Sequence, residues 1–213
     1  MKRMIMIAGA AAALCAGGWM GYEANQPEMA PADMDMGMEM DPAVMMKMMD
    51  KMSQPDTDHH AMLKKMVGTW DMTARFMMEP GTEPEVSKGT TVNKLVLGGR
   101  QLMGEVTMDM NFGGAKYAMQ GISVMGFDKG TNEFQSIWMD TMSTAQMRQS
   151  GEMDGDTLVV TGTSKNPMFG EYTLRNVITF VEGGYDMEFW EKGEMIGPEF
   201  MNTGSIEYRR AAD

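Results

Sequence analysis

Ten short alternating segments between Val67 and Arg209 constrain the fold of this chain more than any other feature. They are joined by turns of Gly, Asn and Asp, which leave no room for a long helix. Regular short strands at this spacing predict a β-sandwich or a closed β-barrel. The expected strands are 67–78, 88–97, 100–110, 116–127, 133–140, 144–153, 156–163, 172–181, 185–192 and 199–209.

The connections between these segments predict the order of the strands. Gly98-Gly99 and Asp154-Gly155 are typical of two-residue hairpin turns, and residues 128–132 form a slightly longer turn. Short turns make neighbouring strands pair antiparallel. Ten such strands must close, because otherwise long sheet edges would stay unpaired. We therefore expect an all-β protein whose residues 56–210 form a closed up-and-down barrel.

The first 18 residues have the three-part pattern of a secretory signal peptide. Lys2-Arg3 is basic, residues 4–14 are apolar, and small residues follow. The apolar run is shorter than the roughly 20 residues that span a bilayer. We expect a periplasmic or secreted protein with no transmembrane span after signal removal. The single cysteine, Cys15, could instead carry a lipid anchor, but Leu14 stands where lipoprotein signals have a small residue.

Residues 19–55 are expected to form a leader rich in methionine and acidic residues. Of the 32 methionines, 12 fall in residues 27–66, and residues 23–40 have almost no branched or aromatic side chains. Such a composition predicts disorder. Asp41 as N-cap and Pro42 as the first helical residue then predict a short helix through about Met52.

A metal site in this leader is one functional interpretation. Thioethers are soft ligands that select Cu(I), and His59-His60 follows downstream. The structural interpretation is a solvated tether in which methionine replaces leucine as flexible apolar filler. The candidate ligands are Met34, Met36, Met38 and Met40.

A second helix is predicted from residue 56 to Met66, with Asp58 as its cap. Leading directly into the first strand, it would plug or rim one end of the barrel. Its two histidines, His59 and His60, point about 100° apart and are poorly placed to bind one metal together. We expect them to be exposed polar residues near the helix start, with a role at the cavity mouth as the alternative.

Several short motifs occur in order along the barrel region. The first contains Gly-x-Trp at the start of a strand, as in lipocalin-like barrels. The motifs are Leu63 with Met66-Val67-Gly68-Thr69-Trp70, Leu97-Gly98-Gly99-Arg100, Gly121 with Gly126-Phe127-Asp128, Trp138-Met139-Asp140 with Met142-Ser143-Thr144, and Asn166-Pro167-Met168 with Arg175-Asn176-Val177.

Together these motifs resemble a family of exported bacterial proteins catalogued as domain of unknown function 1579. The resemblance covers about residues 57–210. It implies export and a calycin-like barrel related to the lipocalins, and it implies no activity. The chain departs from the family pattern at Phe127, where tyrosine is usual, and its methionine-rich leader is not part of that pattern.

Alternation along the strands suggests which residues face a cavity. In the first strand Trp70 and its alternate neighbours should face inward. If Trp138 and Asp140 also face inward, the carboxylate needs a partner, because an unpaired buried charge is costly. Arg100 and Arg175 are the candidates. These five residues are the proposed ligand site, although Trp70 could be a core plug and the ion pair a structural clamp.

The favoured function is non-catalytic binding of a small apolar or amphiphilic molecule inside the barrel. Copper handling by the leader is one alternative, and a hydrolase using a carboxylate such as Asp140 is another. Catalysis has little support, since no histidine in the barrel could complete a Ser-His-Asp or Cys-His arrangement. The net charge of −12 disfavours nucleic acid as a partner. No resident cofactor is expected.

Overall fold

The computed structural model describes residues 41–55, 57–79, 81–166 and 170–212. The signal pattern, Cys15 and the four leader methionines Met34, Met36, Met38 and Met40 lie outside the described residues.

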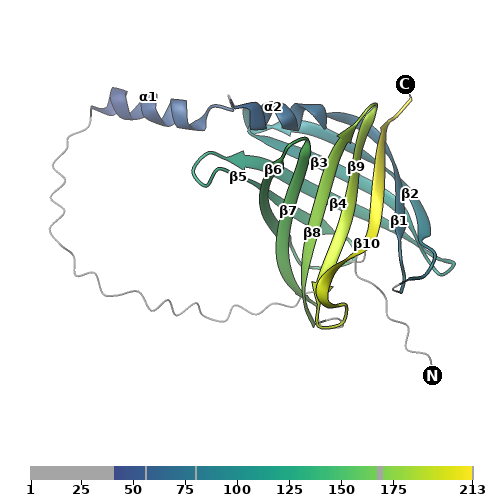
Figure 1. Ribbon diagram of the computed structural model, residues 1–213. Helices are drawn as coiled ribbons and strands as arrows, with labels where there is room; N and C mark the ends of the chain where they lie inside the picture. The colour runs from purple at the N-terminus through teal and green to yellow at the C-terminus, as the bar shows by residue number, and fades with distance from the viewer. Residues whose placement is uncertain (1–40, 56, 80, 167–169, 213) are drawn as a thin grey trace, which may run out of the picture. The chain divides into compact units, whose positions relative to one another are not determined.

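The described residues form a closed barrel of ten antiparallel strands in up-and-down order, as the turn spacing predicts (Figure 1). Closure is complete because β1 pairs with β10 over seven residues, from Trp70 opposite Arg210 to Phe76 opposite Gly204. The strands are β1 (Gly68–Phe76), β2 (Glu85–Val96), β3 (Gln101–Phe112), β4 (Ala115–Asp128), β5 (Glu133–Asp140), β6 (Met147–Asp154), β7 (Thr157–Asn166), β8 (Gly170–Val181), β9 (Gly184–Gly193) and β10 (Gly197–Arg210).

Two turns differ from their predicted form. Val96 pairs with Gln101, so the expected Gly98-Gly99 hairpin is a longer connection that contains a 3-10 turn, η1 (Leu97–Gly99). Gly98 there has φ of 67°, a backbone conformation that glycine adopts without strain. Asp154 pairs with Thr157, which places the next two-residue turn at Gly155-Asp156, one residue later than predicted.

Helix α1 (Pro42–Ser53) belongs to a unit that is separate from the barrel and is described by itself. It begins as predicted, because the Asp41 side chain accepts a hydrogen bond from the backbone N–H of Ala43 at 2.8 Å. None of its residues is buried within the described structure.

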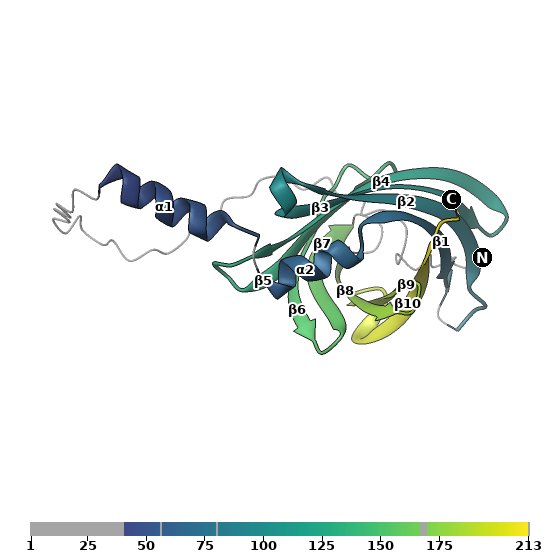
Figure 2. The ribbon, with the colours of Figure 1, turned by 90° about the horizontal axis from the view of Figure 1, so that it is seen from above.

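Helix α2 (Asp58–Lys65) lies over the end of the barrel from which β1 starts (Figures 1 and 2). Its cap is Thr57 rather than the predicted Asp58, since the Thr57 hydroxyl accepts from the backbone N–H of His60. Leu63 is completely buried, and α2 packs against β3 and β4. The helix thus plugs this end, as the sequence suggested.

The prediction that both histidines are exposed is wrong. His60 is only 4% exposed, and its Nδ1 lies 2.7 Å from the Thr57 hydroxyl oxygen. His59 stacks on the ring of Phe127 with centroids 4.0 Å apart. Both histidines contact the barrel because α2 is short and lies against it, so the first turn of the helix also packs on the strands.

A polar and aromatic cluster fills the barrel beneath α2. The Met66 carbonyl accepts hydrogen bonds from the Trp70 indole at 2.8 Å and the Asn93 amide at 3.0 Å. Asn93 also bonds the Tyr185 hydroxyl, and the Tyr185 ring stacks on Tyr208. Burial raises the pKa of both phenols, which stay neutral. This end of the barrel is therefore occupied by its own side chains.

Candidate functional site

The barrel encloses a cavity of about 180 Å³. Residues from all ten strands line it, together with Met66 after α2, because alternate residues of each strand face inward. Thioether side chains are flexible and polarisable, so they adapt to irregular shapes. The methionines that line the cavity are Met66, Met72, Met108, Met110, Met119, Met125, Met147 and Met187.

A partly exposed stretch of the cavity lining follows β5 and the loop after it. At the end opposite α2, Trp138 and Asp140 of β5 are partly exposed, whereas Met110 and Tyr172 at the same end are buried. We call the partly exposed part of this end, around Trp138 and Asp140, the mouth. A small molecule could reach the interior there without removing α2.

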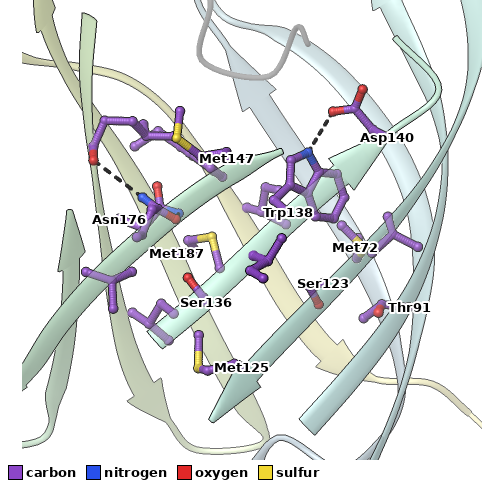
Figure 3. Close-up of a pocket in the computed structure, with 18 of the residues that line it drawn as sticks. Met72, Thr91, Ser123, Met125, Ser136, Trp138, Asp140, Met147, Asn176 and Met187 are labelled. Atoms are coloured by element: carbon purple, nitrogen blue, oxygen red, sulfur yellow. Dashed lines mark hydrogen bonds between the residues drawn. The ribbon is translucent and has the colours of Figure 1, made fainter. Parts of the chain in front are cut away.

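Trp138 and Asp140 form a fixed pair at the mouth (Figure 3). The Trp138 indole donates to Asp140 Oδ2 at 2.7 Å, and the backbone N–H of Met142 donates to Asp140 Oδ1 at 2.9 Å. The sequence did not decide whether these two residues face into the barrel or outward; in the structure both line the cavity. The carboxylate therefore holds the tryptophan ring and the loop that follows β5.

Neither arginine is in the place that the predicted ion pair requires. Arg100 donates to the Leu97 carbonyl in the η1 turn, at the α2 end of the barrel, while Asp140 ends β5 at the other end. Arg175 faces outward from β8 and lies over the Phe200 ring, 3.7 Å from its centroid. Asp140 instead accepts hydrogen bonds from the Trp138 indole and the Met142 backbone N–H. The expected ion pair between Asp140 and an arginine is therefore not formed.

Trp70 is placed as a core residue. It is 3% exposed, its indole bonds the Met66 carbonyl, and the Arg210 guanidinium lies 4.0 Å from its ring centroid. It is absent from the described cavity lining. Of the five predicted ligand residues, the structure thus brings only Trp138 and Asp140 to the described cavity.

Several neutral polar groups face the middle of the cavity, among them Ser123 and Ser136 (Figure 3). The Asn176 amide nitrogen donates to the Gln149 side-chain oxygen at 3.0 Å. The Asn176 Oδ1 atom is buried and has no hydrogen-bond partner within the described structure. This oxygen is able to accept a hydrogen bond from a bound molecule.

Glu191 is a buried acid that the sequence analysis missed. In β9 it continues the inward-facing series of Tyr185, Met187 and Phe189, and it is 0% exposed. Burial raises the pKa of Glu191 to about 8, partly offset by the neighbouring Thr203 hydroxyl. A charged residue at the end of an otherwise apolar alternation was the signal that could have identified it.

The described part of the chain holds no cluster of three or more His, Cys, Asp or Glu side chains able to bind a metal ion. Among those same residues, no helix has the length and apolar character needed to cross a membrane.

Comparison with known proteins gives a family but no activity. The family described as "Protein of unknown function (DUF1579)" matches residues 55–210, which covers the barrel and α2. No curated protein matches the chain.

Proposed function

Since the chain belongs to the DUF1579 family of proteins of unknown function, we propose from the site itself that its barrel binds a small, partly apolar molecule without transforming it. The observation that carries this proposal is the cavity, enclosed by ten strands and reached through a partly exposed mouth. Cavities lined mainly by apolar groups with a few polar ones are typical of ligand sites.

The size of the cavity limits the ligand. An apolar cavity of about 150 Å³ is known to take up benzene. At about 180 Å³ this cavity suits a molecule of one aromatic ring with a short substituent. The methionines adapt to its apolar part, and the Asn176 oxygen and the serines supply polar contacts.

The location of this binding is part of the proposal. The signal pattern of residues 1–18 supports export, so the barrel would meet its ligand in the periplasm or outside the cell.

Titration calorimetry with 2-phenylethanol tests the binding function. The wild-type protein should bind it saturably, and Ser136→Leu should weaken binding at least tenfold, because the added side chain fills the cavity. Gln135→Leu is the matched control, since Gln135 is exposed on the neighbouring position of β5 and should leave affinity unchanged. Absence of saturable binding to the wild type, or equal binding by both variants, contradicts the proposal.

A further inference from the structure

Glu191 is placed beside the cavity, and its two neighbours across the sheet within the described structure are uncharged. Its partner residues on the two neighbouring strands are Leu174 of β8 and Met201 of β10. Leu174 and Phe189, the latter two residues before Glu191 in β9, both line the cavity, whereas the completely buried Glu191 is adjacent to them and is not itself among the described lining residues. An acid inserted into such surroundings must bind a partner or remain protonated.

Both carboxyl oxygens of Glu191 lack a hydrogen-bond partner within the described part of the chain. The Thr203 hydroxyl, whose proximity lowers the pKa of Glu191, makes its hydrogen bond to the Phe189 carbonyl at 3.4 Å instead. Leaving a buried polar group without a hydrogen bond is costly, so a carboxyl with two such atoms is able to accept hydrogen bonds from a bound molecule.

The lining of the cavity, to which Glu191 itself does not belong, indicates the charge of that bound molecule. Asp140 is the one charged residue among the described lining residues, and no lysine, arginine or histidine is found among them. Asp140 already accepts two hydrogen bonds, from Trp138 and Met142, at the mouth. An anionic ligand such as a fatty acid would meet Asp140 in the lining, Glu191 next to the lining in β9 beside Phe189, and no base, whereas a cation would meet complementary charge.

We propose that the barrel's ligand is a small apolar amine whose nitrogen pairs with the Glu191 carboxyl, an inference that rests on the proposed binding function. The ammonium group enters through the mouth, past the face of Trp138, which attracts cations. On pairing, Glu191 releases its proton to solvent and its carboxylate accepts N–H hydrogen bonds from the ammonium. The apolar part of the amine occupies the methionine-lined interior.

Three ligands that share a phenylethyl group and differ in charge test this inference by calorimetry at pH 7: 2-phenylethylamine, 2-phenylethanol and 3-phenylpropionate. We expect the amine to bind the wild-type protein at least tenfold more tightly than either of the others. Repeating the titration in buffers of different ionisation enthalpy should show proton release with the amine and none with the alcohol.

Glu191→Gln should reduce amine affinity at least tenfold, to that of the alcohol, and leave alcohol affinity within twofold. Glu188→Gln is the matched control, because Glu188 is an exposed acid of the same strand, and its removal should not change amine affinity. Should the glutamine variant fold poorly, the wild-type ligand series still decides the question.

The outcomes separate this inference from the function on which it rests. Binding of the alcohol or the propionate as tightly as the amine overturns the role of Glu191 and leaves the binding function standing. Equal loss of amine affinity in both glutamine variants also overturns it, since the effect would then be one of net charge. Failure of all three molecules to bind overturns both proposals.

Discussion

The indole of Trp138 lies over Gly121 of the neighbouring strand β4, in space that any side chain at position 121 would occupy. Gly121 pairs with Asp140, and the same indole donates a hydrogen bond to the Asp140 carboxylate. Thus one glycine and one acid fix the tryptophan ring at the mouth of the cavity. This explains why a glycine and a Trp-x-Asp sequence occur together on adjacent strands.

Gly121→Ala should displace the Trp138 ring, because the added methyl group overlaps it. We expect a loss of about 1–3 kcal/mol in the free energy of unfolding, the usual cost of overpacking. Binding of 2-phenylethanol should weaken at the same time. Urea unfolding and calorimetry measure the two effects, and a variant with unchanged values in both would contradict the coupling.

Glu191→Gln should alter the pH dependence of stability. The pKa of Glu191 is raised in the folded state to about 8 from its ordinary 4.5, so the folded protein retains a proton that the unfolded chain loses. Wild-type stability should therefore fall as pH rises from about 4.5 to about 8, by at most about 1.4 kcal/mol per pH unit from this group.

The glutamine variant lacks this titration, so its stability relative to wild type should be greater at pH 8 than at pH 5. Urea unfolding of both proteins at the two pH values measures the difference. The contributions of all other titratable groups to the pH dependence are the same in both proteins and cancel in the comparison. A relative stability that is the same at both pH values would show that Glu191 does not hold a proton in the folded state.

Leu63→Ala should detach α2 from the barrel, since Leu63 is completely buried at their contact. Removing a buried leucine side chain typically costs 2–5 kcal/mol, and we expect a value of about that size here. Lys64→Ala in the same helix removes an exposed side chain and should change stability by less than about 0.5 kcal/mol. Thermal unfolding distinguishes the two, and similar midpoints would mean that α2 contributes little.

Asn93→Ala should loosen the end of α2, because it removes hydrogen bonds to the Met66 carbonyl and the Tyr185 hydroxyl. Leaving a buried partner unsatisfied costs about 1–3 kcal/mol. Hydrogen exchange of the α2 amides should become faster than in the wild type, while exchange in β7 and β8 stays unchanged. Uniform acceleration across the barrel would instead indicate global destabilisation.

The barrel was predictable from sequence because its determinants are local. Alternation of apolar and polar residues marks each strand, and glycine or asparagine marks most turns, so all ten strands were placed within a few residues of their observed positions. The two-residue period of a strand also predicted that Trp70 and its alternate neighbours in β1 face inward, and their burial confirms this.

The partner of Asp140 could not be predicted in this way, because it depends on strand register. Charge alone favoured Arg100 or Arg175, but one lies at the opposite end of the barrel and the other faces outward. A tryptophan two residues away satisfied the carboxylate instead. The burial of Glu191 and His60 was missed because each is a polar residue at the margin of an apolar pattern.

The seam between β1 and β10 joins the earliest strand made on the ribosome to the last. Trp70 is translated long before Arg210 exists, so an unfinished barrel carries two bare strand edges throughout its synthesis. Such edges invite pairing with other chains, and only release of the final strand removes the hazard.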